Sequence, residues 1–176
     1  MDIRSIIAPV VQDREALEEF ADVLNERAHE IERDIARLAK SPTDREITAS
    51  LFRGVHNIKG DAALCKFELG IAVAHPIESL MSRFREGEIP FSGLLAEMIL
   101  LAVDRLELAT EAFLTGKSTD NLQLLALVQG LEAVAETGVD NLEASCAELI
   151  ESVTGFPPVI PDISTRAPRV STPKPE

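Results

Sequence analysis

Apolar residues recur at every third or fourth position between residues 14 and 39, and this spacing constrains the fold more than any other sequence feature. It is the period of one face of an α-helix, and Glu and Arg fill the opposite face. The same pattern returns in four further segments, residues 44–64, 67–85, 92–115 and 119–136. A sixth segment begins at Asp140. Because 45 % of the chain is hydrophobic and only 4 % aromatic, the sequence predicts an all-α protein.

The apolar stripes of the first two segments predict much of the core: Leu17, Phe20, Leu24, Ala28, Ile31, Ile35, Leu38, Ile47, Leu51, Val55, Ile58 and Ala62. Pro42 ends the first helix, and Thr43 with Glu46 predicts a capping box for the next. Pro76 lies inside the third helix and predicts a kink, since proline lacks the N–H that a helix interior uses. Residues 155–176 hold most of the prolines and show no helical period, which indicates a linker or a disordered tail.

The chain carries a formal net charge of −13, which disfavours both nucleic acid phosphates and anionic membranes as partners. No apolar run reaches the roughly 18 residues that a membrane span needs. The two cysteines, Cys65 and Cys146, lie among apolar neighbours and lack metal-ligand spacing, so we expect buried free thiols. These features predict a cytoplasmic protein without nucleic acid or membrane contacts.

The stretch HNIKGDAALCKF begins with His56, one of three histidines in the chain. His56 follows Val55 of the apolar stripe by about 100° of rotation, so we expect it at the edge of the core with one ring nitrogen open to water. Lys59 and Gly60 share that side of the helix. An imidazole nitrogen is nucleophilic near neutral pH and is able to carry a phosphoryl group. A lysine nearby would place a positive charge beside such an anionic group. A structural histidine at the core edge, with Gly60 serving helix packing, is the alternative.

The stretch AHPIESL places His75 and Glu78 three residues apart on the next predicted helix. If the two helices are antiparallel neighbours, this pair can face His56. A carboxylate that accepts a hydrogen bond from one ring N–H fixes the tautomer and leaves the other nitrogen as the nucleophile. An ordinary surface pair is the alternative interpretation.

These residues lie within LFRGVHNIKGDAALCKFELGIAVAHPIESLMSRFREGEI, which resembles the histidine phosphotransfer (HPt) domain. It is most similar to the N-terminal phosphotransfer domain of chemotaxis-type histidine kinases. That family shows an H-x-x-K-G core, small residues, a phenylalanine, a helix bearing A-H-x-x-E, and then a basic stretch with G-E. The flanking helices extend the resemblance to about residues 14–116.

The resemblance implies an up-and-down four-helix bundle over residues 1–117, with one or two additional C-terminal helices in residues 118–154 that pack on or extend it. It also implies roles for five residues. They are the phosphorylated His56, the phosphoryl-supporting Lys59, the imidazole-bonded Glu78, its helper His75 and the partner-access Gly60. Phe52 is a candidate for an apolar ring around His56 that docks a partner helix and gives it access to the site.

The resemblance further implies the partners. The phosphoryl group would come from the catalytic ATP domain of a histidine kinase, in cis or in trans, or from a receiver aspartate. It would leave to the receiver domain of a response regulator. No cofactor is expected in this chain, because the partner domains would supply Mg²⁺ and ATP. The chain would be a phosphoryl carrier, and its Pro-rich end suggests a module of a longer protein such as a sensor histidine kinase.

Two residues depart from the family pattern. Asp61 stands where the family prefers a small residue, and a carboxylate beside a phosphorylated site is repulsive. Pro76 is able to turn His75 and Glu78 away from the site. The sixth helix exceeds the usual number, and capping of the bundle, dimerisation and connection to another domain are all compatible with it.

Two other classes of function remain open at this stage. A metal-binding four-helix bundle would use Glu26 with His29 and His75 with Glu78, because di-iron bundles carry Glu-x-x-His pairs. However, the second pair is reversed, and His29 lies off the apolar stripe. A purely structural or dimerising helical module is the other class, supported by the segment LQLLALVQGLEAVA, which is apolar nearly all round.

Overall fold

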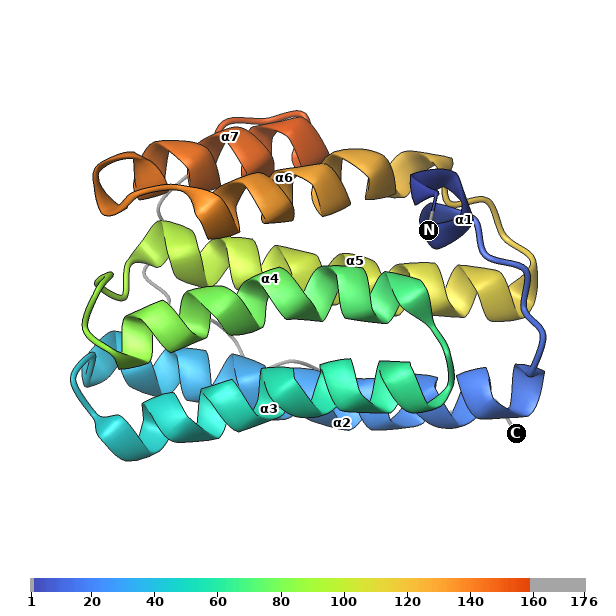
Figure 1. Cartoon of the computed structure of the whole chain (residues 1–176), viewed down its shortest axis with the longest axis horizontal. Coiled ribbons are helices and arrows are strands. Elements are labelled where there is room, and N and C mark those ends of the chain that lie inside the picture. Colours follow the sequence, from blue (N-terminus) through green and yellow to red (C-terminus); the bar gives the residue numbers. More distant parts are fainter. Residues whose placement is uncertain (1, 159–176) are drawn as a thin grey trace.

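A computed structural model describes residues 2–158, and these form helices without a strand (Figure 1). The α-helices are α1 (Ile3–Ile7), α2 (Arg14–Lys40), α3 (Arg45–Leu64), α4 (Glu68–Arg85), α5 (Gly93–Thr115), α6 (Leu124–Glu136) and α7 (Leu142–Thr154). The short 3₁₀ turns η1 (Asp120–Leu122) and η2 (Val139–Asn141) precede α6 and α7. The all-α prediction is therefore confirmed. The predicted tail lies, from residue 159 on, outside the described residues.

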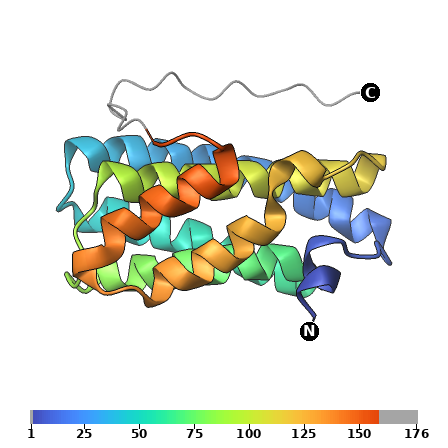
Figure 2. The same ribbon diagram turned by 90° about the horizontal axis from the view of Figure 1, so that it is seen from above.

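The helices stack in three layers of two (Figures 1 and 2). Helices α2 and α3 form one outer layer, α4 and α5 the middle layer, and α6 and α7 the other outer layer. The first two layers make the up-and-down four-helix bundle, in which α2 packs on both α3 and α5. The predicted apolar stripes of α2 and α3 line this bundle, and even the most exposed of those residues, Leu17, is only 6 % exposed.

The α6–α7 hairpin packs on the middle layer, α6 against α4 and α7 against α5. Arg83 of α4 donates from Nη1 to the carbonyl oxygens of Ala135 (3.3 Å) and Thr137 (2.9 Å), which lie where α6 ends. In the structure, most of the large apolar side chains of α6 are buried against the bundle or against α7. Leu125 is the only large apolar side chain of this helix that remains substantially exposed. This removes the support that the sequence of α6 gave to a dimerising module.

A tight turn joins α3 to α4 and makes the two helices antiparallel neighbours. The N–H of Phe67 donates to the carbonyl of Ala62 (2.8 Å), and the N–H of Lys66 donates to that of Ala63 (3.1 Å). Lys66 takes the left-handed conformation (φ 56°), which completes a Schellman-type helix end. Just beyond the turn, a Cβ on Gly70 would lie 2.6 Å from Cβ of Ala62, so the missing side chain lets the two helices approach closely.

Several local predictions were wrong or incomplete. Asp44, rather than Thr43, caps α3, since its Oδ1 accepts from the N–H groups of Glu46 and Ile47. The helix predicted from residue 119 begins only at Leu124, after a 3₁₀ turn, and α1 was not predicted. Cys146 is buried as expected, whereas Cys65 is only half-buried because it forms the end of α3. Helix α4 contains Pro76, as predicted, and the kink expected there stays a prediction.

Within residues 2–158, none of the helices has the length and apolarity needed to cross a membrane.

Candidate functional site

Three charged or titratable side chains meet on the outer surface of α3 and α4. Glu78 of α4 lies between two residues of α3: its Oε2 is 2.8 Å from Nδ1 of His56, and its Oε1 is 2.8 Å from Nζ of Lys59. The register that the Lys66 turn imposes places these residues opposite one another, at similar distances from the turn along each helix. Each carboxylate oxygen of Glu78 therefore has its own donor.

The environment keeps Glu78 ionised. Burial of this side chain, which is 17 % exposed, acts to raise its pKa, but the hydrogen bonds from Lys59 and His56 and their charges outweigh it. The net result is a pKa lowered from the ordinary value of a glutamate. An ionised carboxylate only accepts hydrogen bonds, so Nδ1 of His56 carries a proton, and in the neutral form of the imidazole the lone pair is then on Nε2.

The imidazole of His56 is accessible. Its side chain is 57 % exposed, and none of the described residues forms a hydrogen bond with Nε2. The ring of Phe52, one turn earlier on α3, stacks near it with centroids 6.2 Å apart and an interplanar angle of 11°. A protonated Nδ1, an available Nε2 and an ammonium group nearby make the site suited to nucleophilic attack on an anionic group.

The remaining predicted residues lie in different places. Gly60 is exposed on the turn after His56, and a Cβ there would meet no atom within 4 Å. His75 is exposed on the side of α4 that faces α6, where it lines a pocket with Glu132 and Glu136. Within residues 2–158, it takes no part in the hydrogen bonds that join His56, Lys59 and Glu78. Asp61, about 140° round the helix from His56, is half-buried and does not contact the imidazole either.

Sequence reasoning missed Arg85, whose guanidinium carbon lies 4.2 Å from the centroid of the Phe52 ring. The two residues lie on different helices, and only their register brings them together. Pro76 does not divert Glu78, which reaches α3 from two residues beyond the proline.

The metal-binding alternative gains no support. In the described part of the chain, no three His, Cys, Asp or Glu side chains gather in a way that could hold a metal ion. Nδ1 of His29 lies 2.7 Å from the carbonyl oxygen of Asn25 within its own helix, and Glu26 is exposed.

The model of the Hpt domain family matches residues 15–151, which is most of the chain and includes α2 to α6 and much of α7. The chain belongs to the Hpt domain family. It is therefore a histidine phosphotransfer module of two-component signalling, a system that implies kinase and response-regulator partners.

Curated relatives of this Hpt domain include a sensor histidine kinase and several chemotaxis proteins. It is 26 % identical to the sensor histidine kinase CheAY of Helicobacter pylori over 140 residues, covering 79 % of this chain and 16 % of that protein. It is 29 % identical to the chemotaxis protein CheA of Cereibacter sphaeroides over 131 residues, covering 71 % of this chain and 18 % of that protein. The chain thus spans less than a fifth of either relative. No solved structure matches it.

Proposed function

We propose that His56 is the residue that carries the phosphoryl group. The observation that carries this proposal is the arrangement of one exposed imidazole whose Nδ1 is bonded to an ionised Glu78 and whose Nε2 is accessible. Nδ1 of His29 instead lies 2.7 Å from the backbone carbonyl oxygen of Asn25, and His75 lines a pocket on the side of α4 that faces α6, away from α3.

The proposed reaction is direct transfer to Nε2. The lone pair of Nε2 forms the N–P bond while the bond between phosphorus and the donor oxygen breaks, and the donor oxygen leaves with the electron pair. The proton stays on Nδ1, and the positive charge that develops on the ring is stabilised by the Glu78 carboxylate. Transfer onward reverses these steps, with a receiver carboxylate oxygen as the attacking atom.

Lys59 supports the phosphoryl group in this proposal. Its ammonium lies at the same carboxylate as the imidazole, on the next turn of the helix, and its side chain is 27 % exposed. A phosphoryl group on His56 adds negative charge beside this ammonium. Gly60, exposed beside Lys59, leaves the approach free of side-chain atoms.

The partners are also a proposal. A catalytic ATP domain, in cis or in trans, or a receiver aspartate would donate the phosphoryl group, and a response-regulator receiver aspartate would accept it. Mg²⁺ held by the partner would offset charge on the phosphoryl oxygens. We place this exchange in the cytoplasm and assign it to the bundle of residues 1–117. Residues 118–154 are its supporting layer, and residues 155–176 are a Pro-rich linker or tail.

The test is labelling of histidine variants. The wild-type chain is incubated with radiolabelled ATP and a CheA-type kinase that lacks its own phosphotransfer domain, and in parallel with the small donor phosphoramidate. We expect an acid-labile, alkali-stable label that His56→Gln abolishes in the kinase reaction. His29→Gln and His75→Gln are matched controls that should retain it.

Label that persists in His56→Gln in the kinase reaction would contradict the site assignment. A wild-type chain that accepts phosphate from neither donor would contradict the function itself. Circular dichroism of each variant shows whether the helices remain, so loss of label through unfolding is recognised.

A further inference from the structure

Three side chains from two helices form a continuous stack beside the site. The guanidinium of Arg85 lies over the ring of Phe52, 4.2 Å from its centroid, and the Phe52 ring is nearly parallel to the imidazole of His56. Arg85 ends α4, whereas the two rings lie one turn apart on α3. The stack therefore connects the end of α4 to the proposed nucleophile by a route separate from Glu78.

The hydrogen bond to Glu78 alone does not fix the imidazole. It holds one atom, Nδ1, and leaves the ring free to swing about that contact, because more than half of the His56 side chain is exposed. A flat neighbour at an interplanar angle of 11° restricts the plane of the ring. Transfer in line with phosphorus depends on the direction of the Nε2 lone pair, so the plane matters for rate.

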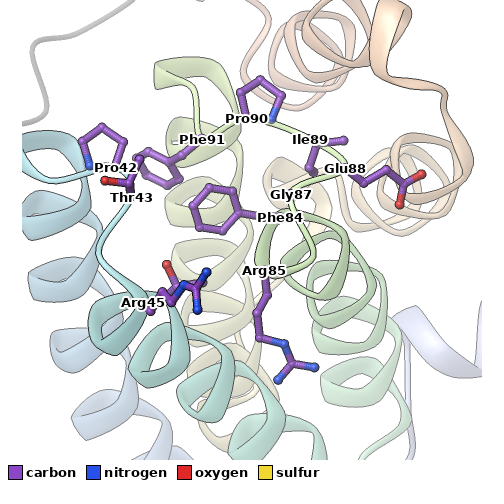
Figure 3. A pocket seen from close by; sticks show the side chains of 11 residues that line it. Pro42, Thr43, Arg45, Phe84, Arg85, Gly87, Glu88, Ile89, Pro90 and Phe91 are labelled. Atoms are coloured by element: carbon purple, nitrogen blue, oxygen red, sulfur yellow. The ribbon is translucent and has the colours of Figure 1, made fainter.

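Phe52 itself is only half-buried, and it needs a restraint of its own. Arg85 supplies one from the opposite helix as a cation over the ring face. Arg85 also lines a hollow of about 830 Å³ at this end of the bundle, together with Phe84, Phe91 and Arg45. Figure 3 shows its guanidinium pointing away from the aromatic wall of that hollow.

We propose that Arg85 and Phe52 are positioning residues that hold the plane of the His56 imidazole for phosphoryl transfer. This inference rests on the proposed function of His56. It gives Phe52 a role within the chain, in place of the partner-docking role for which the sequence makes it a candidate, and it gives Arg85 a role that no motif marks.

A double-mutant cycle tests the proposal. Arg85→Ala, Phe52→Leu and the double variant are compared with wild type at saturating donor, using whichever donor labels the wild-type chain. We expect Arg85→Ala to lower the transfer rate about two- to fivefold, the range of an exposed cation–π contact, with the donor concentration for half-maximal rate unchanged. In the Phe52→Leu background, removal of Arg85 should have no further effect.

A direct role of Arg85 in binding the partner gives the opposite pattern. The half-saturating donor concentration would rise, the two effects would add, and the proposal would be overturned. Arg53→Ala is the matched control, because Arg53 is exposed on α3 next to Phe52 and its removal changes the charge equally. We expect this variant to transfer at the wild-type rate.

A measurement without any partner completes the test. The ring protons of His56 lie in the ring current of Phe52, so Phe52→Leu should shift their NMR resonances. We expect Arg85→Ala to move them part of the way in the same direction. Unmoved resonances in Arg85→Ala refute the positioning role alone. The proposed function is contradicted by the labelling results instead, either by label that persists in His56→Gln or by a wild-type chain that neither donor labels.

Discussion

Replacement of Glu78 by glutamine separates the orientation of His56 from the stability of the fold. The carboxylate accepts two hydrogen bonds of 2.8 Å, one at each oxygen. A glutamine of the same shape has one acceptor oxygen, and its NH₂ group would face either the imidazole N–H or the ammonium. Glu78→Gln therefore loses one of the two contacts, and Glu78→Ala loses both.

The structure sets the magnitude of both effects. A hydrogen bond to a charged group contributes about 1.5–3 kcal/mol when buried. Here His56 and Lys59 are 57 % and 27 % exposed, so water replaces much of what is lost, and we expect Glu78→Ala to destabilise the fold by only about 1–2 kcal/mol. An orienting carboxylate behind a histidine is worth about 10–100-fold in activity, so transfer should fall about tenfold in Glu78→Gln and further in Glu78→Ala.

The assay measures the labelling rate by rapid quenching, and urea unfolding followed by circular dichroism gives the stability. Glu132→Gln, an exposed glutamate on α6, is the control for the loss of one negative charge. Wild-type transfer rates in a folded Glu78→Ala would refute the orienting role. A loss of helicity in that variant would show instead that the carboxylate is structural.

Two further predictions concern pH and the helix glycines. Because the pKa of Glu78 is lowered in the folded state, its contribution to stability is present above its ordinary pKa of about 4.5 and is lost as pH falls through the lowered value. The stability gap between wild type and Glu78→Gln, measured by urea unfolding, should thus shrink as pH falls below 4.5; a gap that widens below 4.5 contradicts this. Gly60→Ala should raise the free energy of unfolding by up to about 1 kcal/mol, because alanine has the higher helix propensity and the added methyl meets no atom. The same variant should nevertheless slow phosphoryl transfer. Gly70→Ala should have the opposite effect and destabilise the fold by about 1–3 kcal/mol, because the added methyl would be overpacked against Ala62. Equal changes in the free energy of unfolding for the two variants would refute the packing argument.

The helices and their buried faces could be predicted from the sequence because each is a local periodic signal. The stripe that includes Leu24, Ile31 and Leu38 repeats with the helical period and is fully buried in the structure. The helix start at Asp44 was harder, since the polar residues Thr43 and Asp44 adjoin and only the backbone conformation decides which one caps. The α1 segment is a single short turn and has too few residues for a periodic signal.

The core of the site was accessible to sequence reasoning because it comes from two consecutive helices joined by a short turn. His56, Lys59 and Glu78 needed only the assumption that these helices are antiparallel neighbours. That assumption does not predict on which side of α4 the His75 side chain lies. Residues three apart on a helix differ by about 60° in direction, and the sequence does not show which side of Glu78 each neighbouring helix occupies. In the structure, His75 falls on the side of α6.

Different sides of α4 contact α3 and α6, and this connects the layer of α6 and α7 to the site. One side of α4 holds Glu78 against α3, and another holds Arg83, whose guanidinium binds two carbonyl oxygens at the end of α6. A rigid helix keeps these two contacts in a fixed relation, so we expect α6 to help hold the position and rotation of the helix that carries the orienting carboxylate. The family match extends past α6 into α7, which fits a phosphotransfer unit that includes the third layer as well as the four-helix bundle. Because a shift of α4 by a fraction of a hydrogen-bond length would move Glu78 from Nδ1 of His56, we expect the α6–α7 hairpin to contribute to the site geometry through α4.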